Sequence, residues 1–132
     1  MASADRRASH GGPARLAQDL PALWAQYDAA PLRMDAINVA YEAIDGQENT
    51  ILAAEPRTFA DIVAVLLIST SRLYAMSSSV IDDDDGPALE MLGDVQARAV
   101  RLLADLTGCD LRSFAATKYT RHGVAAQDGP AP

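Results

Sequence analysis

Apolar residues recur at spacings of three and four along most of the chain, which is the period of an amphipathic helix. A short helix is expected after Asp110, because Leu111, Phe114 and Tyr119 then share one face. No segment shows the alternation of a strand. We therefore expect an all-α fold, an antiparallel bundle of three to four helices. The long helices are expected at about residues 20–29, 32–54, 59–79 and 88–107.

Prolines, glycines and capping residues separate these helices. Pro31 and Pro56 cannot continue a helix. Thr58 and Asp61, three residues apart, resemble a capping box in which Asp replaces Glu. A chain of 132 residues and 14.0 kDa is long enough for one domain. We place this domain at residues 13–122, between mobile tails at 1–12 and 123–132.

The third helix carries the widest apolar stripe of the chain. Its main seam is widened by Val63, Leu67 and Ile68, which turn away from it. Two neighbouring helices cannot cover so broad a stripe, so we expect these three residues to form an interface between two copies of the chain. Alternatively, the Trp24 helix and the segment around Phe114 cover the stripe within one chain. In the fourth helix the residues expected to point inward are Leu89, Leu92, Val95, Ala99, Leu102 and Leu106.

Charge and hydropathy narrow the range of partners. The net charge of −7 and the pI near 4.6 disfavour duplex nucleic acid, whose phosphates an acidic surface repels. The longest apolar run has seven residues, 62–68, whereas a membrane span needs about 20. No apolar stretch follows the arginines near Met1, as a secretory signal would require. We expect a cytoplasmic protein with a protein partner, either a second copy or another chain.

The expected core lacks the usual catalytic side chains. No His, Cys or Lys occurs between residues 19 and 107, which removes the common general base, thiol nucleophile, soft metal ligand and Schiff-base amine. The acidic run at residues 82–85 does not fit a calcium loop, because placing Gly86 at position 6 puts Ile81 and Leu92 at positions 1 and 12. We predict no catalytic residue, cofactor or metal, although enzymatic activity stays open.

One polar residue interrupts the apolar seam of the second long helix. Glu48 lies in register with Tyr41 and its apolar neighbours. It either sets the register by pairing with a nearby arginine or contributes to an internal pocket. In the second interpretation Tyr41, Glu48, Arg72 and Tyr74 line that pocket.

The stretch from Leu20 to Leu106 resembles small all-helical proteins of unknown function found in alphaproteobacteria. The resemblance rests on residues 48–54 (ENTILAA), on the connection PRT at 56–58 into FADI at 59–62, and on the acidic break before a Leu-rich helix. It implies a bacterial helical protein and carries over no functional residue.

The sequence therefore allows two functions. The first is a non-catalytic helical interaction protein that self-associates or docks on a protein partner. The alternative is a small-ligand-binding or enzymatic bundle built around the pocket. An internal cavity with convergent polar groups favours the second, and a filled core with an exposed apolar face favours the first.

Overall fold

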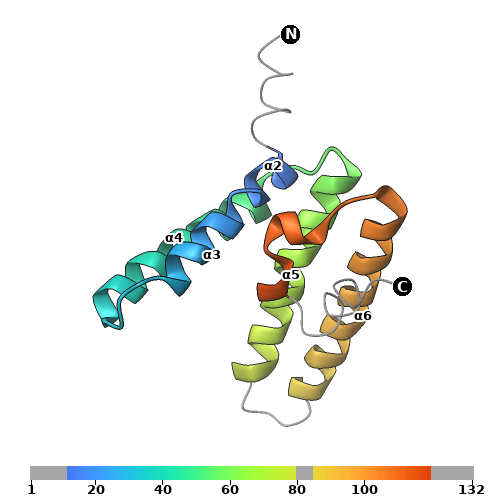
Figure 1. Cartoon of the computed structure of the whole chain (residues 1–132). Coiled ribbons are helices and arrows are strands. Elements are labelled where there is room, and N and C mark those ends of the chain that lie inside the picture. The colour runs from blue at the N-terminus through green and yellow to red at the C-terminus, as the bar shows by residue number, and fades with distance from the viewer. Residues whose placement is uncertain (1–11, 80–84, 120–132) are drawn as a thin grey trace, which may run out of the picture.

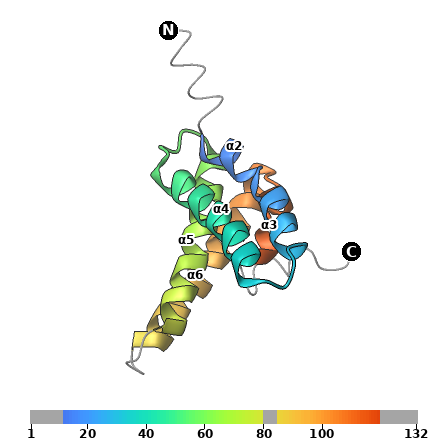
Figure 2. The ribbon, with the colours of Figure 1, turned by 90° about the vertical axis from the view of Figure 1, so that its left-hand side faces the viewer.

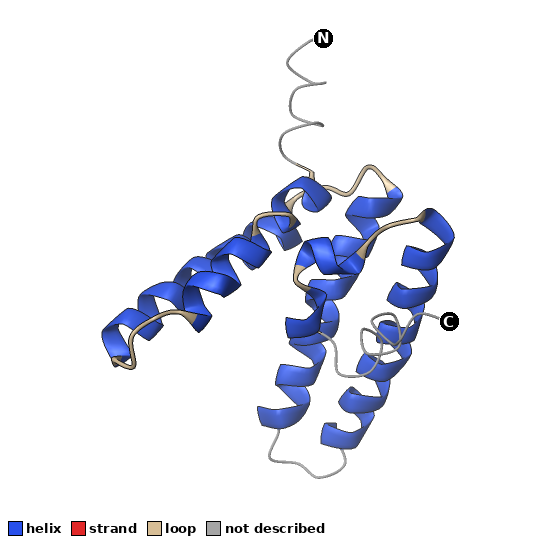
Figure 3. Ribbon diagram, viewed as in Figure 1, coloured by secondary structure: helices blue, strands red, loops and turns tan. Residues whose placement is uncertain are grey.

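A computed structural model describes residues 12–79 and 85–119 of the chain. The predicted tails at 1–12 and 123–132 lie outside the described residues except for Gly12. Every regular element of the described part is helical (Figure 3), which confirms the all-α fold. The α-helices are α2 (Pro13–Ala17), α3 (Leu20–Asp28), α4 (Met34–Ala53), α5 (Phe59–Ser79) and α6 (Asp85–Thr107), followed by the 3-10 helices η1 (Leu111–Phe114) and η2 (Ala116–Lys118).

The long helices form two hairpins. α5 and α6 run antiparallel, because Tyr74 late in α5 bonds Asp94 while Leu66, two turns earlier, bonds Gln96 further along α6. α3 packs on α4, and this pair leads away from the α5–α6 hairpin (Figures 1 and 2). Met34 at the start of α4 is accordingly exposed. The three long helices therefore do not share one axis along their whole length, as a single bundle would require.

The core is centred on the first half of α5. Val63, Leu67 and Ile68 are each 0% exposed, so the prediction that they form an interface between copies is wrong. α2 packs on α5, and η1 contacts α2 and α3, which closes the core over this face. The competing prediction, coverage within one chain, is what the structure shows. The same cluster contains Ala17, Leu20, Leu111, Phe114 and Tyr119.

α6 presents the opposite face from the one expected. Its buried residues are small: Gly93, Ala97, Val100 and Ala104. Four of the five bulky residues predicted to point inward are instead exposed, at 51% for Leu92, 50% for Val95, 59% for Leu102 and 75% for Leu106, and the fifth, Leu89, is partly buried. The physical reason is close packing, since a Cβ atom built on Gly93 would lie 2.8 Å from Cε1 of Tyr74. Only a face of small residues lets α6 approach α5 this closely.

A buried carboxylate joins the start of α5 to α2. The Asp61 carboxylate accepts hydrogen bonds from the backbone N–H groups of Ala14 (2.9 Å), Arg57 (2.9 Å) and Thr58 (3.2 Å). The Thr58 hydroxyl accepts one from the Asp61 N–H at 3.0 Å, which confirms the predicted capping box. Burial raises the pKa of Asp61, but the hydrogen bonds outweigh it and hold the pKa below its usual value.

The close α5–α6 contact can be tested with two matched glycine substitutions. Gly93→Val should lower the free energy of unfolding by about 2 kcal/mol, because the new side chain collides with the Tyr74 ring. Gly46→Val, in the interior of α4 with no atom within 4 Å of its Cβ position, should change it by less than about 0.5 kcal/mol. Urea unfolding followed by the fluorescence of the single tryptophan measures both. Equal effects of the two substitutions would contradict the close contact.

The Asp61 carboxylate gives a pH-dependent prediction. Because its pKa is lower in the folded chain than the ordinary value of 3.8, its stabilisation is complete above pH 3.8 and is lost as the pH falls below it. Asp61→Asn turns an NH₂ group toward backbone N–H groups and should cost about 1–3 kcal/mol at pH 7. The control Asp19→Asn removes only an exposed pair with Arg15 and should cost less than about 0.5 kcal/mol. Urea unfolding at pH 7 and pH 3 measures both variants, and equal losses would contradict the anchoring role.

Candidate functional site

A polar pocket lies where α3, α4, α5 and η2 meet. Its volume is about 230 Å³. Three of the four predicted pocket residues, Tyr41, Glu48 and Arg72, line it. The fourth, Tyr74, lies elsewhere: it is buried against Gly93, and its hydroxyl donates to Asp94 at 2.6 Å. The remaining lining residues are Trp24, Asp45, Ser71, Ala75, Lys118 and Tyr119.

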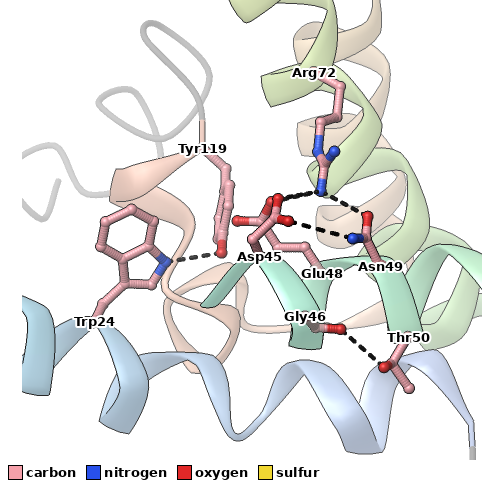
Figure 4. Close-up of polar contacts among 8 residues, drawn as sticks. All are labelled: Trp24, Asp45, Gly46, Glu48, Asn49, Thr50, Arg72 and Tyr119. Carbon is pink, nitrogen blue, oxygen red and sulfur yellow. Dashed lines mark hydrogen bonds and ion pairs between the residues drawn. The ribbon is translucent and has the colours of Figure 1, made fainter. Parts of the chain in front are cut away.

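Arg72 of α5 is held by one face of α4. Its Nη2 atom donates to Glu48 Oε1 at 3.1 Å, to Asn49 Oδ1 at 3.1 Å and to Asp45 Oδ1 at 3.3 Å (Figure 4). Positions 45, 48 and 49 are three and four residues apart and so share one side of the helix. Glu48 therefore has the partner that the register-setting interpretation expected, and the pairing ties α4 to α5.

Tyr119 completes this cluster from the C-terminal segment. Its hydroxyl accepts a hydrogen bond from Trp24 Nε1 at 2.8 Å (Figure 4). The same hydroxyl is hydrogen-bonded to the Glu48 side chain. Next to it, Lys118 Nζ lies 3.0 Å from the Asp28 carboxylate and 5.1 Å from the centre of the Trp24 ring. The pocket prediction missed Tyr119. The apolar face shared by Leu111, Phe114 and Tyr119 indicated docking but did not indicate that the hydroxyl reaches α4.

Burial dominates the electrostatics of the cluster. It raises the pKa of Glu48, whose side chain is 12% exposed, and the hydrogen bonds from Tyr119 and Arg72 offset this only in part. Burial likewise raises the pKa of the Tyr119 hydroxyl well above its usual value, so the phenol stays protonated and donates. The cluster is thus a set of mutually satisfied polar groups, an arrangement that positions helices.

Two observations on the described residues bear on reaction chemistry. Burial, together with the neighbouring Asp110, raises the pKa of the Cys109 thiol, which lowers its nucleophilicity at neutral pH. Within residues 12–79 and 85–119, no group of three His, Cys, Asp or Glu side chains is placed to hold a metal ion.

A second candidate site is the outer face of α6. We define the α6 outer stripe as Leu92, Val95, Ala99, Leu102 and Leu106, all of which are exposed. Their spacing of three, four, three and four is that of a coiled-coil seam. Gln96, one turn from Leu92 and Ala99, donates to Leu66 O at 3.1 Å and marks the edge of the stripe next to α5. The stripe has the geometry of a helix-pairing surface.

α5 itself is strongly apolar. In the part of the chain that the structure describes, Phe59–Ser78 is the one segment long and apolar enough to cross a membrane, with a mean hydropathy of 1.5. Of the 18-residue window that meets this criterion, 39% is buried inside the protein. The central helix of a water-soluble core meets the same criterion.

No protein family, curated protein or solved structure matches the chain. The resemblance to helical alphaproteobacterial proteins therefore stays a prediction.

The raised pKa of Glu48 predicts how the cluster responds to pH. Because the folded pKa lies above the ordinary 4.5, the stability contributed by Glu48 falls as the pH rises from 4.5 through the raised value. Glu48→Gln keeps the acceptor and has no charge to bury. Its free energy of unfolding at pH 7 should equal or exceed that of the wild type, and the fall above pH 4.5 should be reduced.

The partner variant Arg72→Leu leaves the Glu48 charge without its cation. It should cost about 1–2 kcal/mol at pH 7, since the pair is partly exposed, and the loss should shrink below pH 5. The control is Arg57→Leu, which removes an exposed ion pair with Glu55 and should leave the free energy of unfolding almost unchanged. Urea unfolding across pH 4–8 measures all three, and a Glu48→Gln variant less stable than the wild type by more than about 1 kcal/mol would mean that ion pairing outweighs burial.

Proposed function

We propose that the protein is a non-catalytic helical interaction protein whose binding surface is the α6 outer stripe. This proposal rests on how the small and the bulky apolar residues of α6 are distributed between its buried and exposed faces. Small residues pack against α5, and the bulky heptad residues Leu92, Leu102 and Leu106 face outward. A fold that needed those residues for its own core would bury them. Their outward position at coiled-coil spacing favours a partner helix.

The energetics support the same function. Fully burying a Leu or Val side chain contributes about 1.5–3 kcal/mol, and each large residue of the stripe is already half buried or less. Covering the stripe would therefore contribute about 1 kcal/mol of stabilisation for each large side chain. Together, these contributions offset a substantial part of the free-energy cost of association, which is about 4–15 kcal/mol.

The pocket supports the alternative function less well. Small-molecule sites commonly have volumes of about 300–1,000 Å³, and the volume of this pocket is about 230 Å³. Arg72 and Lys118, the cations that would hold an anionic ligand, are already paired with Glu48 and Asp28. A ligand would have to displace those contacts, so the interaction function is the better supported of the two.

Photo-crosslinking in the cells that produce the protein tests the proposed surface. A photoreactive residue at Val95, within the stripe, should give crosslinked protein adducts. The same residue at Arg101, exposed on the charged side of α6, is the control and should give few. Denaturing gels followed by mass spectrometry detect the adducts and identify the second chain. Equal yields at the two positions, or none at either, would contradict the proposal.

A further inference from the structure

We propose that the polar pocket between α3, α4, α5 and η2 binds a quaternary ammonium head group, in the place that the Lys118 ammonium takes in this structure. The pocket is separate from the α6 outer stripe, so this inference goes beyond the proposed function. The ligand is a free trimethylammonium compound or the trimethylated lysine side chain of another protein, since both carry the same head group.

Three aromatic side chains line the pocket. These are Trp24, Tyr41 and Tyr119, and Tyr27 packs against two of them, with its ring centre 5.4 Å from that of Trp24 and 6.3 Å from that of Tyr41. Four of the seven Phe, Trp and Tyr residues of the chain therefore gather here. The rings of Trp24 and Tyr119 are inclined by 76°, with their centres 6.0 Å apart (Figure 4). Aromatic rings that enclose a cavity from several sides form the cages that hold quaternary ammonium groups.

A cation already lies against one of these rings. Lys118 Nζ is 5.1 Å from the centre of the Trp24 ring and 3.0 Å from both carboxylate oxygens of Asp28. Lys118 thus marks a place in the pocket where an ammonium group is stable. The side chains of this ion pair are 34% and 55% exposed, so the pair contributes little to stability. A ligand takes the same place when the Lys118 head group turns into solvent.

The charges of the pocket favour a cationic ligand over an anionic one. Arg72, the second cation in the lining, is held by Glu48 at 3.1 Å and by Asp45 at 3.3 Å. An anionic ligand would have to separate a cation from its carboxylate and leave that carboxylate unpaired. A cationic ligand only replaces the Lys118 ammonium, so the total charge of the site is unchanged. Arg72 keeps its carboxylate partners in this exchange, and they offset its repulsion of the ligand.

A quaternary head group suits the pocket better than a primary ammonium does. A primary ammonium has three N–H donors that need acceptors. Lys118 finds its acceptors in Asp28, which is not among the residues that line the pocket. A trimethylammonium group donates no hydrogen bond and gains from contact with aromatic faces. The volume of about 230 Å³ is small for a drug-sized ligand but suits a compact head group.

The single tryptophan of the chain gives a direct readout of binding, since Trp24 lines the pocket. Choline chloride, compared with sodium chloride at the same ionic strength, should change the Trp24 emission with a dissociation constant in the millimolar range. Lys118→Ala removes the competing ammonium and should lower the dissociation constant about 10-fold. Lys118→Arg keeps a cation at this position and should bind choline about as the wild type does.

Two matched aromatic substitutions and a neutral ligand test the aromatic walls. In the Lys118→Ala chain, Tyr41→Leu removes an exposed wall of the pocket and should raise the dissociation constant about 5-fold. Phe59→Leu, at an exposed aromatic residue outside this pocket, should change it by less than about twofold. The alcohol 3,3-dimethylbutan-1-ol has the shape of choline without its charge and should bind about 10-fold more weakly. Urea unfolding checks that each variant is folded.

Two results would overturn the proposal. The first is a Lys118→Ala chain whose Trp24 emission responds no more to choline chloride than to sodium chloride. The second is equal binding of choline and the neutral alcohol, which would make the pocket merely apolar. The amide of N-acetyl-trimethyllysine then identifies the source of the head group: tighter binding than choline indicates a protein side chain, and weaker binding a small molecule. Crosslinking at Val95 does not involve this pocket, so failure here leaves the proposed function in place.

Discussion

The contact between Gly93 of α6 and the Tyr74 ring of α5 is the constraint on which the arrangement of the C-terminal hairpin depends. The ring is buried, and its hydroxyl is fixed by Asp94, so it leaves no room for a side chain at position 93. α6 must therefore turn its small residues toward α5. Since a helix surface is continuous, this choice of inner face also decides that the bulky heptad residues lie outside. One packing contact thus determines both the core and the exposed surface.

The N-terminal half depends on polar contacts to a greater extent. Asp61 joins α2 to the start of α5 through backbone amides, and Arg72 joins the middle of α5 to α4. Both anchors are satisfied within the chain, but their charges behave differently. Hydrogen bonds hold the Asp61 carboxylate ionised, whereas burial disfavours the ionised form of Glu48 beside Arg72. Acidification should therefore weaken the first anchor and relieve the second.

Much of the fold could be predicted from the sequence because helix boundaries are local. The expected helix at 59–79 agrees with α5, and the Thr58–Asp61 capping box that begins it is present. The inner face of α6 could not be predicted in the same way. Periodicity shows which apolar residues share a face, but α6 has two apolar faces, one with small side chains and one with bulky ones. Ranking the two faces by hydrophobicity predicts that the bulky one is buried. The close approach of α5 at Gly93 depends on tertiary packing, and it buries the face of small side chains instead.

The candidate site shows the same division between local and long-range information. Tyr41, Glu48 and Arg72 lie together because helical spacing within α4 brings two of them to one face and a single long-range ion pair brings the third. The prediction for Tyr74 was wrong because its position around α5 directs its side chain to α6 and not to the pocket. Tyr119 lines the pocket although periodicity could not predict it, because the segment that carries it is not a regular α-helix.

The net charge of the chain bears on how a partner could approach the α6 outer stripe. The chain carries −7, so it repels a partner of the same sign at long range, although physiological salt screens this repulsion over about 8 Å. At contact distance the local charges matter more, and α6 carries both signs beside an uncharged stripe. Uncharged seam residues remove the desolvation cost that buried charges would impose. Exposed charges beside the stripe act on the orientation of a partner more than on its affinity, because exposed ion pairs contribute about 1 kcal/mol or less. Apolar burial would supply the attraction, and the charges would supply the specificity.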